Sequence, residues 1–446
     1  MSFLDYILSH SPILYFTQSL WRDEAFSVLV ASRPLSAFIG KLAFETPLYY
    51  IVLHYWMKLF GTTELAVRSL SLVAFALATV VMIFWAESMF KKHWLSWYVP
   101  ILFFTNPMLL YYAFEARFYG WVIFLSTLSL YAFTKESWRL WIVATILGFY
   151  THTYFLFIPF VQVIYYLRMH SRLLKQKNWA LAIKDPFMGA GAISLLCMSP
   201  WLLKIAAEAS RLKQSWYYPV DLKLVTSVLG NMFIGYEGTP WYVWQYMPFV
   251  TLGFLFIFYL AMKNSHRRQR NLYILLTAIV PLIVVVGISF IKPLFVNRYF
   301  LYVTIAQVLL IAYAIENISH ELTKKAVAAI ILGLVVWVNF WYPAEHKKLP
   351  IRDTIMEINL LRGPKDVILA KSPLIFFESI YYSGDPSKVF LYNPEHSPFP
   401  WYVGDMIVSA EQMVDELPPY PIRAFLVSDD GSYTIAYQTD TLARRK

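Results

Sequence analysis

The stretch YFLYVTIAQVLLIAYAI, residues 299–315, carries no charged side chain and is long enough to cross a lipid bilayer as one helix. About 17 to 25 apolar residues in a helix span roughly 30 Å of hydrocarbon. Similar stretches recur along most of the 446-residue chain, in which 58% of the residues are hydrophobic and 18% are aromatic. We therefore predict an all-α polytopic membrane protein with about eleven transmembrane helices. The expected spans are residues 3–20, 66–86, 95–112, 118–134, 138–151, 153–167, 187–206, 246–262, 272–291, 299–315 and 326–342.

The net charge of +10 comes from basic residues that are scattered between these spans. A nucleic-acid-binding protein gathers such residues on one soluble face, so nucleic acid is not an expected partner. Short loops rich in Lys and Arg stay in the cytoplasm, and here they occupy alternate loops. We expect the N-terminus inside and the C-terminal part outside the cell membrane. The basic loops are residues 91–94, 134–139, 168–177, 263–270 and 321–325.

This alternation requires that residues 47–60 do not cross the membrane. The segment is short and rich in Tyr, His and Trp, which favours a helix at the membrane surface over a span. Residues 25–39 are expected to form a second helix of this kind, closed by Pro34. The first span is interrupted by Asp5 and His10 and lacks a basic start and a small-residue cleavage site, so we expect no cleavable signal there.

The composition changes after Pro343, where long apolar runs give way to alternating helix and strand patterns with turn signals between them. We predict a transmembrane domain over residues 1–343, followed by a small soluble α/β domain over residues 344–446 on the extracytoplasmic side. The single cysteine, Cys197, lies in a predicted span, so the outer domain has no disulfide and Cys197 is expected to be a packing residue. The sequence has no Walker or Rossmann glycine pattern, which argues against nucleotide chemistry.

Ionisable side chains occur at the predicted outer ends of several spans and in the outer loops. Such groups are costly near a bilayer, and they mark function when they face a protein cavity. The planar fork of arginine suits a phosphate, and a carboxylate suits proton abstraction from a hydroxyl. A lipid phosphate whose head group lies outside the membrane would meet these groups. They are Asp23, Glu24, Glu45, Arg68, Glu115, Arg117, His152 and Arg298.

Several of these residues fall in an ordered set of motifs. The acidic pair of WRDEAF, residues 21–26, is followed by the proline-led ETPLYYIVLHYW and by FGTTELAVR, and later by EARFYG and RYFL. In this order and on one predicted side, the motifs resemble those of the GT-C glycosyltransferases. Among them the bacterial and archaeal protein-mannosyltransferase-like and aminoarabinose-transferase-like enzymes are the most similar. The resemblance covers about residues 20 to 345.

The resemblance implies a GT-C fold and a sugar donor carried on a polyprenyl phosphate. It implies transfer, with inversion, to a hydroxyl of a lipid, glycan or protein acceptor. Asp23 would be the catalytic base and Glu24 its neighbour in the acidic pair. We expect the donor phosphate at Arg68, Arg117 and Arg298, and the substrate or a metal near Glu45, Glu115, Tyr119, His152 and Tyr299.

The chain departs from the family pattern at Glu45, Thr46 and Pro47. Several relatives carry His-Pro-Pro or Glu-Lys-Pro there, so a phosphate-binding lysine of that kind is missing. Some relatives hold a divalent metal cation near this glutamate, but a single carboxylate leaves metal dependence open. Acceptor or phosphate contacts are expected in the outer loop 207–245, which carries no recognisable motif.

Each of these residues also has a purely structural interpretation. Acids favour helix N-termini, arginines near span ends reach lipid head groups, and a histidine at a span end is often a hydrogen-bonded packing residue. The alternatives are a helix cap at Asp23 and Glu24, snorkelling at Arg68 and Arg298, a structural pair of Glu115 with Arg117, and packing at His152.

A membrane transporter or lipid flippase is the main alternative function. Transporters bind their substrates near the bilayer midplane, on helices that are broken by Gly or Pro in repeated halves. Here the charges lie at the predicted outer ends of the spans, and the sequence has no internal repeat. These two features favour the glycosyltransferase.

The orientation is tested with reporters fused at two positions. Because the basic loops alternate, a reporter after residue 266 should behave as cytoplasmic and one after residue 360 as extracytoplasmic. An enzyme reporter that is active on only one side of the membrane measures this. If the two reporters exchange sides, residues 47–60 cross the membrane and the predicted outer site does not exist. If both report the same side, the three spans predicted between residues 266 and 360 are wrong.

Overall fold

The computed structural model describes residues 3–42, 44–170, 185–210, 219–235, 239–263 and 268–438. Contacts divide the chain into two compact units. The helical unit contains residues Met1–Tyr15, Ala43–Tyr49 and Arg68–His346. The mixed unit contains Phe16–Leu42, Tyr50–Val67 and Lys347–Lys446. The domain boundary predicted after residue 343 stays a prediction, and the contacts place two early segments in the same unit as the C-terminal residues.

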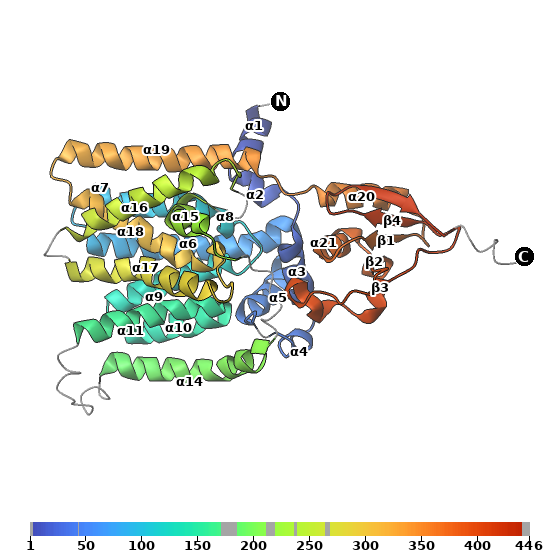
Figure 1. Ribbon diagram of the computed structural model, residues 1–446, viewed down its shortest axis with the longest axis horizontal. Coiled ribbons are helices and arrows are strands. Elements are labelled where there is room, and N and C mark those ends of the chain that lie inside the picture. The colour runs from blue at the N-terminus through green and yellow to red at the C-terminus, as the bar shows by residue number, and fades with distance from the viewer. Residues whose placement is uncertain are drawn as a thin grey trace, which may run out of the picture. The chain divides into compact units, whose positions relative to one another are not determined.

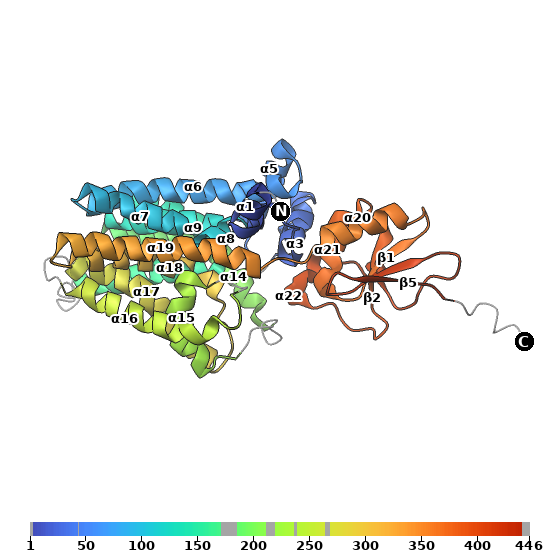
Figure 2. The same cartoon turned by 90° about the horizontal axis from the view of Figure 1, so that it is seen from above.

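Six described helices are long and apolar enough to cross a membrane, and three further helices, α9, α11 and α15, are apolar but shorter. Figures 1 and 2 show the long helices running side by side in the helical unit. This confirms the predicted all-α membrane fold class. The six are α6 (Glu64–Met89), α14 (Pro186–Ala207), α16 (Met247–Met262) with the turn before it from Trp244, α17 (Arg268–Ser289), α18 (Leu301–Glu316) with the turn before it from Asn297, and α19 (Glu321–Glu345). The shorter ones are α9 (Tyr119–Thr134), α11 (Phe157–Met169) and α15 (Leu222–Ile234), next to α10 (Trp138–Thr151).

Helix α18, which contains most of the stretch 299–315, lies at the centre of the helical unit. It packs against α16, α17 and α9, and every residue from Leu301 to Ile315 is buried. A helix that is apolar on all sides needs such a position. Two of its polar side chains bond to the backbone of α15: Gln307 Nε2 donates a hydrogen bond to the carbonyl of Leu229 at 2.8 Å, and the hydroxyl of Thr304 donates one to the carbonyl of Met232.

The first predicted span, residues 3–20, is not one helix. It forms two short helices, α1 (Phe3–His10) and α2 (Ile13–Thr17), which are separated at Ser11 and Pro12. Proline has no N–H to continue the hydrogen bonds of a helix, so the chain breaks there. The apolar composition of this segment suggested a longer helix than the backbone can form.

The predicted span 95–112 is also divided. Helix α7 (His93–Thr105) ends before Asn106, and α8 (Pro107–Ala113) begins directly after it. The side-chain oxygen of Asn106 accepts a hydrogen bond from the N–H of Leu109 at 3.1 Å, so Asn106 caps α8. Proline at the first helical position reinforces the new start.

The early part of the mixed unit contains α3 (Arg22–Ala31), α4 (Leu35–Phe38) and α5 (Leu48–Phe60), whose first two residues belong to the helical unit. The helix predicted over residues 25–39 is therefore two helices, because Pro34 ends the first and begins the second. The helix predicted over residues 47–60 is present as α5.

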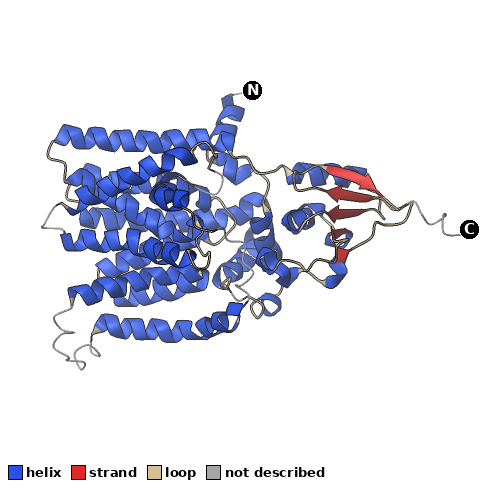
Figure 3. Ribbon diagram, in the orientation of Figure 1, coloured by secondary structure: helices blue, strands red, loops and turns tan. Residues whose placement is uncertain are grey.

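The C-terminal part of the mixed unit is built on a five-stranded sheet in the order β3-β2-β1-β4-β5 (Figure 3). Helix α21 (Pro373–Ser383) packs on β1, β2 and α20 (Ile351–Leu361). The first four strands in this order are parallel, and β5 pairs antiparallel with β4. The structure thus confirms the predicted small α/β domain. The strands are β1 (Val367–Ala370), β2 (Val389–Tyr392), β3 (Met413–Val414), β4 (Ala424–Val427) and β5 (Tyr433–Ala436).

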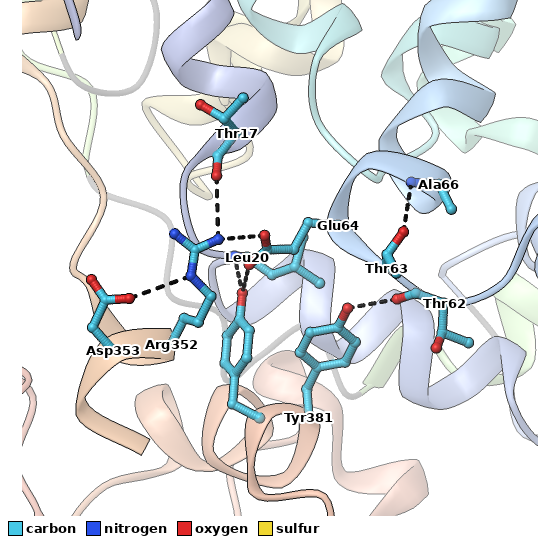
Figure 4. Close-up of polar contacts among 10 residues, drawn as sticks. Thr17, Leu20, Thr62, Thr63, Glu64, Ala66, Arg352, Asp353 and Tyr381 are labelled. Atoms are coloured by element: carbon cyan, nitrogen blue, oxygen red, sulfur yellow. Dashed lines mark hydrogen bonds and ion pairs between the residues drawn. The ribbon is translucent and has the colours of Figure 1, made fainter. Parts of the chain in front are cut away.

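A polar cluster joins the early segments of the mixed unit to its C-terminal helices (Figure 4). The carboxylate of Glu64 accepts a hydrogen bond from Arg352 Nη1 at 2.6 Å and another from the hydroxyl of Tyr382. The same hydroxyl accepts the N–H of Leu20 at 2.6 Å. The segment before α3 and the first turn of α6 are therefore bonded to α20 and α21. The glutamate of the FGTTELAVR motif has a structural role in this cluster.

Candidate functional site

Two arginines flank a row of aromatic rings in the helical unit. Cζ of Arg117 lies 4.9 Å from the ring centre of Phe118. Phe118 stacks on His152 at 4.7 Å between ring centres, and His152 lies 4.5 Å from Tyr299. Cζ of Arg298 lies 5.9 Å from the ring centre of Tyr299. The structure therefore brings together two predicted phosphate-binding residues and two residues predicted to lie near the substrate.

The EARFYG motif places Arg117 in the turn between α8 and α9. Gly120, in the first turn of α9, lies so close to α6 that a Cβ atom would be 2.3 Å from the carbonyl oxygen of Ser71. The hydroxyl of Ser71 donates a hydrogen bond to the carbonyl of Arg117 at 2.8 Å. The missing side chain at Gly120 allows this close approach, and the approach fixes the backbone of Arg117.

Two further ionisable residues of the predicted site, Arg68 and Glu115, are buried. Like Arg298, they are between 0% and 2% exposed. Glu115 and Arg298 both interact electrostatically with the side chains of Tyr112 and Tyr119. The ring centres of these two tyrosines are 4.9 Å apart. A snorkelling arginine extends to the surface, so the burial of Arg68 and Arg298 does not fit that alternative.

His152 lies between α10 and the short turn that precedes α11, outside the predicted spans. Burial lowers its pKa, and the positive charges of Arg117 and Arg298 add to this effect, which brings the pKa to about 3. The imidazole is therefore neutral at physiological pH. Its Nδ1 accepts a hydrogen bond from the N–H of Tyr154 at 3.3 Å. These surroundings suit an orienting and packing role better than proton transfer.

Glu45 pairs with Arg117, because its Oε1 accepts a hydrogen bond from Arg117 Nη2 at 3.1 Å. The structural pair of Arg117 therefore involves Glu45, and Glu45 stays about one-third exposed. Within the described ranges, no group of three or more His, Cys, Asp and Glu residues is arranged to hold a metal ion. One carboxylate that faces a guanidinium does not fit a divalent cation, so we derive no metal-dependent step.

The acidic pair lies at the start of α3 in the mixed unit. Glu24 is fully buried, and its carboxylate accepts the N–H of Trp21 at 3.2 Å, which caps the helix. The ammonium of Lys348 donates to the same oxygen at 2.9 Å. Asp23 is more accessible, with 14% of its side chain exposed, and it forms an ion pair with Arg22 at 2.8 Å. The two acids therefore have different surroundings: Glu24 is closed off from solvent, and Asp23 is partly accessible.

Sequence reasoning missed Lys348, which is the partner of Glu24. One signal was present in the sequence. Lys347 and Lys348 are adjacent basic residues on the predicted outer side, whereas the other basic segments lie in the predicted cytoplasmic loops. The predicted contact loop 207–245 is only partly described. Residues 211–218 and 236–238 of that loop lie outside the described residues.

Comparisons with known proteins place this geometry in a known fold. No protein-family model matches the chain, and no curated protein matches its sequence. The crystal structure of ArnT from Cupriavidus metallidurans in the apo state matches with a TM-score of 0.62 and 13% sequence identity. The structure of that ArnT bound to undecaprenyl phosphate matches with a TM-score of 0.62 and 12% identity. Each match covers 95% of this chain and 91% of the other.

The chain shares the fold of ArnT. This confirms, at the level of the fold, the predicted resemblance to the aminoarabinose-transferase-like GT-C enzymes. The likeness to ArnT includes the C-terminal part, because it extends over nearly the whole length of both chains.

The mixed unit of this ArnT-like chain also contains a buried carboxyl group that sequence reasoning missed. Glu378, on α21, is 8% exposed. Burial raises its pKa to about 8, although the positive charges of Arg22 and Lys348 act in the opposite direction. The negative charge of Asp23 adds to the increase. Glu378 is therefore mostly protonated at neutral pH.

Glu378→Gln should gain stability relative to the wild type as the pH rises from about 5 to about 9. In the wild type the carboxyl of the unfolded chain ionises from about pH 4.3, whereas the folded pKa is raised. The stability present below the unfolded pKa is therefore lost as the pH rises through the folded pKa, and glutamine does not titrate. Thermal unfolding of the purified protein should show the difference growing by at least about 1 kcal/mol. Glu395→Gln, at an exposed position, is the control, and a difference independent of pH would contradict the raised pKa.

Proposed function

We propose that this chain is an integral membrane glycosyltransferase that moves a sugar from a polyprenyl-phosphate donor to an acceptor hydroxyl. The observation that carries the proposal is the fold shared with ArnT, which has been solved with undecaprenyl phosphate bound. A polyprenyl phosphate combines a hydrocarbon chain with an anionic head group. It therefore suits a protein with long apolar helices and buried arginines. The alternation of basic loops supports a site and a C-terminal domain on the extracytoplasmic side.

Arg117 and Arg298 are proposed to hold the donor phosphate. Their guanidinium groups flank the same row of rings, and both are almost fully buried. A charge-assisted hydrogen bond is stronger in such surroundings than in water. Glu45, which is about one-third exposed, pairs with Arg117, and a phosphate oxygen of the donor would take its place. Tyr299 and His152 would then support the sugar or the phosphate from the side.

The proposed reaction is an inverting displacement at the anomeric carbon. The acceptor oxygen forms a bond to this carbon while the bond from the carbon to the donor phosphate oxygen breaks. The polyprenyl phosphate leaves with the electron pair as a stable anion and needs little help from an acid. The acceptor hydroxyl must lose its proton, and a carboxylate that receives it contributes on the order of 10² to 10⁴ in rate.

Asp23 is the proposed acceptor of this proton. It is the more exposed member of the acidic pair, and its helix start is held by the cap at Glu24. Glu24 is closed off by Lys348 and by the N–H of Trp21, so it suits positioning better than proton transfer. The role of Asp23 thus rests on accessibility as well as on the resemblance.

Arg117→Lys and Arg298→Lys should each weaken binding of undecaprenyl phosphate by about tenfold. Lysine retains the charge but loses the fork that makes two parallel hydrogen bonds to a phosphate. Binding of the labelled lipid to the purified variants measures this. Arg139→Lys, at an exposed position of α10, is the matched control and should bind normally. If both site variants bind the lipid normally, Arg117 and Arg298 do not hold the donor phosphate.

Asp23→Asn should abolish transfer while expression and donor binding are retained. Asparagine keeps the shape of the side chain but cannot accept the proton, so the rate should fall by a factor on the order of 10² or more. Cells without the gene, restored with the wild type or with Asp23→Asn, are compared by mass spectrometry of their lipids and glycans. A glycosylated product should appear only with the wild type.

Two further variants serve as controls for Asp23. Glu24→Gln should be milder in transfer than Asp23→Asn. Asp353→Asn, which changes an exposed acid of α20, should leave the product unchanged. If Asp23→Asn restores the product fully, Asp23 is only the structural partner of Arg22 and the base must be sought at Glu45 or Glu115.

A further inference from the structure

A pocket of about 580 Å³ lies in the helical unit, away from the proposed donor site. It is formed where α9 and α11 end and where α14 and α17 begin. Helix α9 begins at Tyr119, beside the donor site, and ends at Thr134, in the wall of the pocket. At 1.5 Å per residue the two ends of α9 are roughly 22 Å apart. The pocket is therefore separate from the proposed donor site.

The wall of this pocket contains Arg270, whose guanidinium has hydrogen-bond donors without an acceptor in the described part of the chain. Its Nε and Nη2 atoms are buried, and neither has a hydrogen-bond partner among the described residues. The guanidinium lies over the ring of Tyr313, with Cζ 5.1 Å from the ring centre. A ring face attracts a cation but accepts no strong hydrogen bond from the fork of an arginine. Buried donors of this kind are costly unless an acceptor reaches them.

The carboxylate of Asp185, also in the pocket wall, is already engaged. One oxygen accepts hydrogen bonds from the N–H groups of Phe187 and Met188, so Asp185 caps α14. Its other oxygen accepts the hydroxyl of Tyr166. Asp185 is therefore satisfied without Arg270, and an acceptor for Arg270 has to come from elsewhere.

About half of the remaining lining is aromatic and includes Phe133, Trp138, Tyr165, Phe187 and Tyr273. The polar side chains of Glu136, His170 and Gln269 also line the pocket. Rings of this kind beside a guanidinium suit a ligand with an anionic group joined to an apolar body. The helices that form the pocket are also those of the predicted spans, so its surroundings are the end region of a membrane-embedded bundle.

We propose that this pocket binds the phosphate group of a membrane lipid at Arg270. The phosphate oxygens accept the hydrogen bonds of the guanidinium, and the glycerol and the first carbons of the acyl chains lie against the rings. This site is distinct from the donor site and does not depend on the proposed transferase activity. By the orientation of the basic loops, it lies on the cytoplasmic side.

The test uses the full-length chain in lipid nanodiscs with photoreactive phosphatidylglycerol. Peptide mass spectrometry should locate crosslinks at the end of α11 and the start of α17. Arg270→Gln should reduce these crosslinks about tenfold, since the charge-assisted contact is lost. Arg268→Gln is the matched control, because it removes the same charge from the same helix turn at an exposed position that does not line the pocket. The control should keep the crosslinks.

A second variant addresses the pocket without removing the charge. Thr134→Trp fills the space beside the rings, so it should also lose the crosslinks while its thermal unfolding midpoint stays near that of the wild type. Absence of crosslinks in the wild type, equal crosslinking of both arginine variants, or full crosslinking of Thr134→Trp would overturn the proposal. An excess of glycerol phosphate that abolishes the crosslinks would mean that the pocket takes a soluble phosphate compound and not a lipid.

Discussion

The cost of placing charge in a low-dielectric interior is the constraint on which both units depend. In the helical unit, Arg117 is buried and is held by Glu45, by the backbone contact of its turn and by a ring. In the mixed unit, Glu24 is fully buried and is held by Lys348 and by a helix N–H. Removing one partner from such a pair leaves an uncompensated buried charge, which costs several kcal/mol. In each unit, these groups therefore hold their surroundings in one arrangement.

Much of the fold follows from the length and polarity of the apolar stretches. Residues 299–315 identify the central helix, and the change of pattern after Pro343 identifies the α/β part. The breaks at Pro12 and Asn106 were not predicted. An average over an apolar window is insensitive to a single proline or capping side chain, whereas the backbone hydrogen bonds depend on it.

The candidate site was predictable to a smaller extent. The motifs located Arg117 and Arg298, and the predicted outer end of a span located His152. The structure brings all three to one row of rings. The lysine that pairs with Glu24 was not predictable, because Lys348 comes from the C-terminal part and has no motif of its own. A single sequence shows which residues are charged but not which distant residues will neutralise them. The fold shared with ArnT at 13% identity illustrates the same point, since the chain path persists while most side chains differ.

The ion pair between Glu24 and Lys348 joins residues that are 324 positions apart in the chain. During synthesis, α3 leaves the ribosome long before α20, α21 and the sheet that complete its unit. Until then Glu24 cannot pair with Lys348, and the apolar side of α3 is not covered by α21. A chain with such long-range contacts folds slowly, and its hydrophobic surface stays exposed until these contacts form. The early segments of the mixed unit can therefore complete their packing only after the C-terminal residues of the chain have been made.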